Sequence, residues 1–172
     1  MELRPLDNDA CRLAASWLAQ KENYQWLDFG NGIQALGAPS LKIMAQRGLH
    51  LMRVFTADSG DSPIGLVALS NIAPGFKTAT LWFLLGDKSY ANQGYTTRAV
   101  SKILTRGFGE SGLQAVNAWA VDRNAPSIKT IQRNNFRLVG RLRKCHYIDG
   151  RPCDRLLFDI LKSEHQETGY ER

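Results

Sequence analysis

The sequence predicts a mixed α+β domain in which helices cover both faces of a mostly antiparallel sheet. Helical and strand-like periodicities alternate along nearly the whole chain of 172 residues. A two-residue hairpin signal, Asp149-Gly150, also separates the last two long strand-like segments. The expected order is helix, helix, three strands, helix, strand, helix and two strands, which is typical of a mixed sheet packed by helices.

The first half of the chain predicts two helices and then a meander of three strands. Between about Asp7 and Gln20, apolar residues recur on one helical stripe. Ser40 is expected to precede a second, short helix, which Gly48 ends in the left-handed conformation. Three strand-like segments separated by turns follow, and they are His50 to Ala57, Ile64 to Ile72 and Thr78 to Leu85.

The second half predicts two further helices and three strands. A loop at Tyr90 to Tyr95 opens a helix, because apolar positions between Ala99 and Phe108 lie on one helical face. A strand from Ala115 to Val121 is followed by a short helix led by Asn124, with Pro126 in its first turn. Two long strands complete the sheet, and they are Phe136 to Tyr147 and Pro152 to Leu161.

The composition predicts one domain at residues 1–162, followed by a polar C-terminal tail at residues 163–172. The chain is 44% hydrophobic and 22% charged, without a linker or repeat. No apolar run approaches the roughly 20 residues that cross a bilayer, and the N-terminus does not resemble a signal peptide. The three cysteines form no C-x-x-C pair, and no His/Cys spacing resembles a zinc site. We therefore expect a cytoplasmic protein that contacts no membrane and needs no metal.

Positive charge is concentrated in one third of the chain. Between Arg123 and Arg155 there are nine basic and two acidic residues, so this segment carries +7, against +6 for the whole chain. Such a segment forms a solvated face, a nucleic-acid-binding surface or a binding surface for a multiply phosphorylated small ligand. No nucleic-acid module is present and aromatic residues are not interleaved with the charges, so nucleic acid is not the expected partner.

One loop has the form of a phosphate-binding site. It reads Ala91-Asn92-Gln93-Gly94-Tyr95-Thr96-Thr97 and lies between a strand and a helix N-terminus. Unpaired amides at a helix start point toward a ligand, and the helix dipole favours negative charge there. A single glycine before a helix is also found in loops that only connect elements. The loop has no Walker lysine, so nucleotide triphosphate hydrolysis is not indicated.

This loop resembles the acyl-CoA loop of the GNAT superfamily of acyl-CoA N-acyltransferases, in particular its RimJ/RimL-type branch. That loop reads R/Q-x-x-G-x-G/A, and often G-x-G-Y-A-T-E-A in the branch. Three positions depart from the pattern, with Ala91 for Arg or Gln, Thr96 for a small residue and Arg98 for Glu. A backbone cradle needs amides more than side chains, and Arg98 is either solvated or placed to meet a phosphate.

A second segment resembles the family block N-x-x-S followed eight residues later by G-F. It begins at Asn124-Ala125-Pro126-Ser127 and ends at Asn135-Phe136. Asn135 stands where the pattern has the glycine of a helix C-cap, and asparagine tolerates that positive φ better than other residues after glycine. The resemblance covers most of the chain and is most specific from about Ile64 to Ile160.

The resemblance implies a GNAT-like acyltransferase fold with acetyl-CoA as co-substrate. Amides of the loop would hold the donor phosphates, and the backbone edge of the preceding strand would hold the pantetheine arm. Lys129 or Arg133 would reach part of the phosphate charge. The implied donor-binding residues are Leu84, Leu85, Asn92, Gln93, Gly94, Tyr95, Thr96, Thr97, Asn124 and Lys129.

The resemblance also implies that Ser127 is catalytic, as the proton donor to the leaving thiolate. Many members of the superfamily use a tyrosine seven residues after the asparagine, and Ile131 at that position cannot donate a proton. Ser127 at the start of a helix has a favourable field for a nearby anion. Its alternative role is to cap the helix. For Asn124 the sequence does not separate capping from holding the donor.

The general base and the acceptor pocket stay open at this point. The candidate bases are Glu22, Asp28, Asp87, His146 or a chain of water molecules. In the predicted hairpin Ile148 pairs with Arg151, which places His146 opposite Cys153. These two residues form either a half-buried strand pair or a Cys-His nucleophile. The aromatic residues that line an acceptor pocket or pack in the core are Trp17, Tyr24, Trp26 and Phe29.

The expected function is N-acetyl transfer from acetyl-CoA to a primary amine of a small molecule or amino sugar, by direct attack in a ternary complex. An alternative is a protein N-terminal or lysine acetyltransferase. A further alternative is a non-catalytic, acyl-CoA-binding regulatory module, suggested by the departures at Ala91 and Ile131. Acetyl-CoA and a small amine are the expected partners, with a homodimer as a possible assembly.

Overall fold

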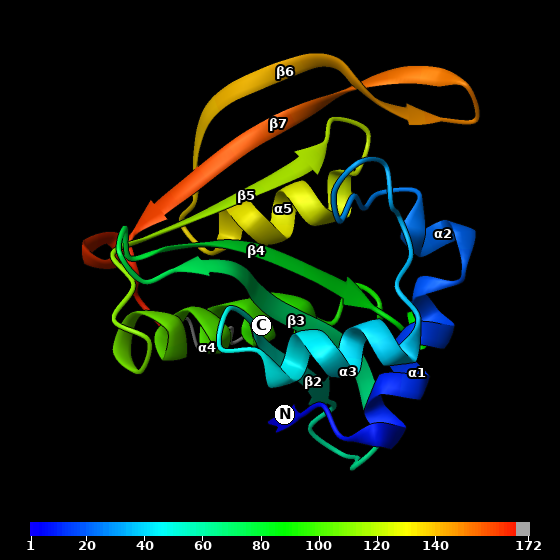
Figure 1. The fold of residues 1–172 in the computed structure, drawn as a ribbon, viewed down its shortest axis with the longest axis vertical. Coiled ribbons are helices and arrows are strands. Elements are labelled where there is room, and N and C mark those ends of the chain that lie inside the picture. The colour runs from blue at the N-terminus through cyan, green and yellow to red at the C-terminus, as the bar shows by residue number, and fades with distance from the viewer. Residues whose placement is uncertain (168–172) are drawn as a thin grey trace.

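The computed structural model describes residues 1–167 as a seven-stranded sheet with helices on both faces (Figure 1). The sheet order is β1-β2-β3-β4-β5-β7-β6, and every neighbouring pair is antiparallel except β4 and β5. The predicted fold class is therefore confirmed. The strands are β1 Leu3–Pro5, β2 Leu51–Thr56, β3 Pro63–Ala73, β4 Thr78–Leu85, β5 Ala115–Val121, β6 Arg137–Ile148 and β7 Arg151–Leu161. The helices are α1 Asn8–Leu18, α2 Lys21–Tyr24, α3 Ala38–Gln46, α4 Tyr95–Gly109 and α5 Ala125–Arg133, with 3₁₀ turns at Lys88–Tyr90 and Lys162–Glu164.

Two apolar cores lie on opposite faces of the sheet. Along β3, Leu66 and Ala68 pack against α1 and α3, whereas Val67 and Leu69 pack against α4. This alternation follows from the two-residue period of a strand, which turns successive side chains to opposite faces. β3 is buried on both faces for this reason, and it reads as a nearly continuous apolar run.

The feature that positions the site is the divergence of β4 and β5. These parallel strands pair only at their N-terminal ends, from Thr78–Thr80 to Ala115–Asn117. Beyond Thr80 the two strands separate, and α5 lies beside the gap (Figure 1). The C-terminal half of β4 keeps β3 as its neighbour on one side and has no strand on the other.

Several local predictions are confirmed at the level of single residues. α1 begins directly after Asp7, close to its predicted start, and Asp7 caps it by accepting a hydrogen bond from the Ala10 amide at 2.8 Å, a role that was not predicted. Asn135 adopts a φ of 62°, as predicted for a residue in place of glycine. Asp149 and Gly150 both have positive φ, 50° and 73°, which is the conformation of a type I′ hairpin turn.

The start and end of α3 were predicted wrongly. The helix begins at Ala38 after Gly37, with Pro39 in its first turn, so Ser40 lies inside the helix instead of capping it. Proline fits a first turn because its φ is already helical and its missing N–H is not needed there. The helix ends at Arg47 in an extended conformation, and Gly48 is not among the residues with positive φ.

Two short elements at the N-terminal end were not predicted. β1 has three residues, one of them Pro5, and α2 has a single turn, so neither has a readable periodicity. Of the predicted C-terminal tail, Glu164 binds Arg137 and His165 packs against Phe108. The remainder of that tail, from residue 168, lies outside the described residues. Within residues 1–167 no helix is long and apolar enough to cross a membrane.

Candidate active site

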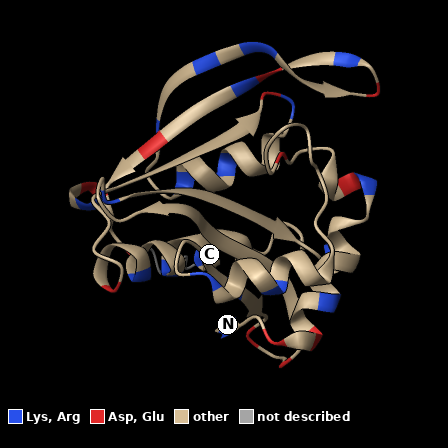
Figure 2. Cartoon of the chain, viewed as in Figure 1, with Lys and Arg blue, Asp and Glu red and all other residues tan. Residues whose placement is uncertain are grey.

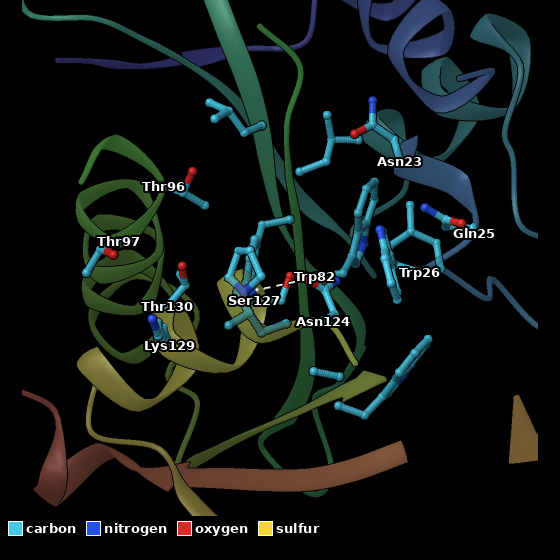
Figure 3. A pocket seen from close by; sticks show the side chains of 18 of the residues that line it. Asn23, Gln25, Trp26, Trp82, Thr96, Thr97, Asn124, Ser127, Lys129 and Thr130 are labelled. Carbon is cyan, nitrogen blue, oxygen red and sulfur yellow. Dashed lines mark hydrogen bonds between the residues drawn. The ribbon is translucent and has the colours of Figure 1, made fainter. Parts of the chain in front are cut away.

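A cavity of about 980 Å³ opens where β4 and β5 diverge. Its walls come from the N-terminal end of α4, from the length of α5, from β4 and β5, and from the segment between Glu22 and Gly30, with smaller contributions from α3 and β3. Figure 3 shows Thr96, Ser127, Lys129 and Thr130 on the helical side, with Asn23, Gln25 and Trp26 opposite them. Elements from both faces of the sheet therefore contribute to the walls of the cavity.

The N-terminus of α4 presents a row of unused amides to this cavity. Gly94 precedes the helix in the left-handed conformation, with a φ of 81°, and no side chain caps the helix. The first helical bond runs from the Arg98 amide to the Gly94 carbonyl, at 3.0 Å. In the described chain the five amides from Gln93 to Thr97 have no hydrogen-bond acceptor, so this turn is suited to an anion.

The free edge of β4 supplies a second set of backbone groups. The amide of Gly86 donates to the Ile64 carbonyl of β3 at 2.8 Å. Because bonding alternates along an antiparallel strand, Leu84 also points its amide toward β3, whereas Phe83 and Leu85 point theirs toward the gap. Leu84 thus lines the cavity with its side chain. The backbone available to an extended ligand belongs to Phe83 and to the amide of Leu85, because the Leu85 carbonyl accepts a hydrogen bond from Lys88 Nζ at 2.5 Å.

Ser127 lies in the first turn of α5 with its hydroxyl uncommitted. Asn124 caps the helix, because its side-chain oxygen accepts a hydrogen bond from the Ser127 amide at 3.3 Å (Figure 3). The Ser127 hydroxyl makes no hydrogen bond within the described chain and lines the cavity. Ile131 is 1% exposed and packs in the core, so no side chain acts from that position.

Nearly all of the predicted site residues come together in this cavity. Ten of the eleven line it, and they are Leu84, Leu85, Asn92, Gly94, Tyr95, Thr96, Thr97, Asn124, Ser127 and Lys129. Gln93 does not line it, because its side chain turns back to donate to the Ser89 carbonyl at 3.1 Å. Its backbone amide still belongs to the unpaired row.

The basic residues divide into two groups. Lys129 and Arg133, on α5, line the cavity. Much of the remaining positive charge follows β6 and β7, away from the cavity (Figure 2). Arg98 has neither of its two predicted roles, since both of its terminal nitrogens bind Asp58 at 2.7 Å and its guanidinium lies over Tyr95. This pairing holds the pKa of Asp58 far below its usual range.

Two of the candidate bases lie away from the cavity. Asp87 caps the 3₁₀ turn after β4, and hydrogen bonds from Ser89 lower its pKa. The ring of His146 is buried, and both of its nitrogens are engaged. Its Nε2 donates to the Gln25 carbonyl at 2.7 Å, and its Nδ1 accepts from Arg155 at 3.0 Å. Neither residue is placed to take a proton from a bound amine.

The two other candidate bases line the cavity. Burial alone would raise the pKa of Asp28, but hydrogen bonds from Arg155 and from the amides of Gly30 and Gly32 outweigh it and leave the pKa lowered. Asp28 is therefore a poor proton acceptor at neutral pH. Glu22 is exposed at the rim, close to Lys88.

The predicted hairpin register places His146 opposite Cys153, and the structure confirms it. Both residues are buried in the strand pair. Because the ring nitrogens of His146 bind Gln25 and Arg155, no Cys-His nucleophile is formed. The strand-pair interpretation is the correct one.

Several aromatic residues of the cavity were not predicted or were only partly predicted. Trp26 and Phe29 line the cavity, which was one of the two alternatives given for these aromatic residues. Trp17 packs in the core, and Tyr24 is not among the cavity residues. Trp82 and Trp119 were missed, although each faces the cavity from a strand that was predicted. Within residues 1–167 no three His, Cys, Asp or Glu side chains form a metal site.

The divided sheet, the unpaired amides of α4 and the uncommitted hydroxyl of α5 are the features expected of an acyl-CoA-dependent transferase. A family model described as "Acetyltransferase (GNAT) domain" matches residues 1–137. The chain belongs to the GNAT acetyltransferase family, of the RimJ/RimL type.

Individual relatives agree with this assignment. The chain is 31% identical over 115 residues to the probable N-acetyltransferase YjcK of Bacillus subtilis. The aligned segment covers 66% of this chain and 62% of the relative. The curated relatives that it matches are covered over 55% to 62% of their own length.

Two solved structures share the fold at low sequence identity. One is a spermidine N-acetyltransferase from Vibrio cholerae in complex with CoA and spermine, with a TM-score of 0.81, 17% identity and coverage of 95% of this chain and 96% of that one. The other is RimJ from Mycobacterium smegmatis in complex with CoA-disulfide, with a TM-score of 0.77, 21% identity and coverage of 94% and 82%.

Proposed function

We propose that the protein is an N-acetyltransferase that moves an acetyl group from acetyl-CoA to a primary amine of a small molecule or amino sugar. The observation that carries this proposal is the row of unpaired amides at Gly94, which shares one cavity with the free edge of β4 and the Ser127 hydroxyl. CoA is bound in the two solved structures of the same fold.

The donor occupies the α4 and α5 side of the divided sheet. Its phosphates meet the amides from Gln93 to Thr97, and Lys129 with Arg133 adds positive charge beside them. The pantetheine arm runs along Phe83 and Leu85, whose backbone groups point into the gap. Transfer proceeds in a ternary complex, because the acceptor reaches the same gap from the other face.

The chemical step is direct attack. The neutral amine forms a bond to the thioester carbonyl carbon, and the carbon–sulfur bond breaks. Ser127 passes a proton to the leaving thiolate and regains one from water in the cavity. Water in the open cavity accepts the proton released by the amine, since the candidate bases in residues 1–167 are engaged, distant or held at the rim.

The test is an acceptor screen with acetyl-CoA that measures thiol release. The panel contains small amines, amino sugars and peptides with free N-termini or lysines, because a protein N-terminal or lysine acetyltransferase is the alternative in the same class. Turnover confined to the peptides would support that alternative. Saturable binding of acetyl-CoA with no turnover of any acceptor would support a non-catalytic, acyl-CoA-binding module.

A further inference from the structure

Aromatic side chains line the part of the cavity that faces away from α4 and α5. We call Trp26, Phe29, Trp82 and Trp119 the aromatic wall. Trp119 alternates along β5 with Ala118 and Ala120, which pack in the α4 core, so it lies on the opposite face of the sheet. Trp82 packs with the core of α1 and α3, on this same face. The aromatic wall is therefore on the acceptor side of the gap.

Two members of the wall lie outside both apolar cores and have an unpaired indole N–H within the described chain. Trp26 and Trp119 belong to neither apolar core, and their indole N–H groups have no hydrogen-bond partner among residues 1–167. By contrast, Trp82 donates its N–H to the Ser70 hydroxyl at 2.8 Å and meets Phe29 edge-on at 5.0 Å.

The Trp119 ring has Arg155 over one face, 4.1 Å from its centroid, and His146 beside it, with ring centroids 5.9 Å apart, so its remaining surface faces the cavity. Two large half-buried indoles that face a cavity in this way are suited to contact a ligand ring.

The charges around the wall disfavour an acceptor with several positive charges. Asp28 is bound by Arg155 at 2.8 Å, and Glu22 lies near the Lys88 ammonium. The Arg155 guanidinium also covers one face of the Trp119 ring, 4.1 Å from its centroid. Among the described cavity residues both carboxylates, Asp28 and Glu22, therefore have a cationic neighbour already, and neither is free to bind a second ammonium group.

From these two observations we infer that the acceptor is a primary amine carried on a flat aromatic body, without a second positive charge. Its ring lies against Trp26 and Trp119, and its amine points into the gap between β4 and β5. This inference rests on the proposed N-acetyltransferase function and names the acceptor class of the same site.

The experiment compares three amines at saturating acetyl-CoA. The probes are 2-phenylethylamine, ethylamine, which lacks the ring, and spermidine, which adds positive charges. We expect kcat/KM for 2-phenylethylamine to exceed both others by at least about tenfold, since a buried ring contributes more than that factor. No turnover of 2-phenylethylamine, or equal or faster turnover of ethylamine or spermidine, would overturn the inference.

Matched variants locate the effect in the wall. Trp26→Leu and Trp119→Leu should each lower kcat/KM for 2-phenylethylamine at least about fivefold and leave that for ethylamine within about twofold. Phe76→Leu is the control, because Phe76 is 85% exposed and lies outside the cavity. An equal loss for both amines in the wall variants would contradict a ring-binding role.

A calorimetric titration with acetyl-CoA separates this inference from the function on which it rests. Normal acetyl-CoA binding without a preference for the aromatic amine would overturn the acceptor class alone. Absence of acetyl-CoA binding would overturn the proposed function itself.

Discussion

The substitution Ser127→Ala should lower turnover by about 100-fold while the fold and the affinity for acetyl-CoA are kept. General acids contribute roughly 10² to 10⁴ in rate. The lower end applies here, because a thiolate with a pKa of about 8.5 is a good leaving group and water in the cavity replaces part of the proton donation. A factor of 100 corresponds to about 2.7 kcal/mol of transition-state stabilisation.

The structure also predicts what this substitution does not change. Asn124, and not Ser127, caps α5, and the Ser127 hydroxyl has no partner within the described chain. Unfolding free energy should therefore stay within about 0.5 kcal/mol of the wild type. The assay is steady-state thiol release, with donor affinity measured separately by calorimetry. Thr130→Ala is the matched control, since Thr130 lines the same cavity one turn later and should lose less than about threefold.

Two results would refute this reasoning about Ser127. One is a kcat for Ser127→Ala within about twofold of the wild type. The other is an equal loss of turnover in Ser127→Ala and Thr130→Ala, because it would indicate a general effect of altering α5.

Three further predictions concern stability. Gly65→Ala should reduce the free energy of unfolding by about 2 kcal/mol or more in a denaturant titration, because the added Cβ would lie 2.6 Å from the Leu84 carbonyl oxygen of the adjacent strand. Asn124→Ala should cost about 1 kcal/mol by removing the α5 cap, and should lower the melting temperature accordingly. Asp58→Asn should destabilise the protein above about pH 4, and progressively less as the pH falls. Pairing with Arg98 and the N-terminal amine lowers the folded-state pKa of Asp58, so the stabilisation by this ion pair is lost when Asp58 becomes protonated.

For each stability prediction, one result would contradict the reasoning. Gly60→Ala is the control for Gly65→Ala, because no atom lies within 4 Å of its added Cβ, and equal effects at the two sites would reject the steric argument. For Asn124→Ala, an unchanged melting temperature would show that the cap contributes nothing. For Asp58→Asn, a difference from wild type that is the same at pH 3 and pH 7 would exclude a titrating ion pair.

The parts of the site that depend on local chemistry were predictable from sequence. Asn135 at positive φ and the Asp149-Gly150 turn follow from the conformational preferences of single residues. For Asn124 the sequence left capping and donor binding open, and the structure shows the cap. The loop at Gly94 was recognisable because its residues resemble the acyl-CoA loop of the family, whereas a single glycine before a helix would not have distinguished it from a connecting loop. These features require no knowledge of which strands become neighbours.

The parts that depend on long-range contacts were not predictable. The divergence of β4 from β5 arises because only three residue pairs join them, and no sequence pattern records where a parallel pairing stops. The sequence left Asp28 as a candidate base, because its contact with the Arg155 guanidinium, 127 positions away, is visible only in the structure. Trp119 likewise acquires its place in the cavity from the separation of strands and not from its own periodicity.

The most direct test of the central claim is a calorimetric titration with acetyl-CoA of the wild type, Gly94→Glu and Gly109→Glu. Gly94 lies at the unpaired amides with a φ of 81°, whereas Gly109 is exposed in the last turn of the same helix with no atom within 4 Å of its added Cβ. We predict saturable binding by the wild type and by Gly109→Glu, and none by Gly94→Glu. Binding that survives in Gly94→Glu, or is absent from the wild type, would contradict the assignment of this turn as the donor site.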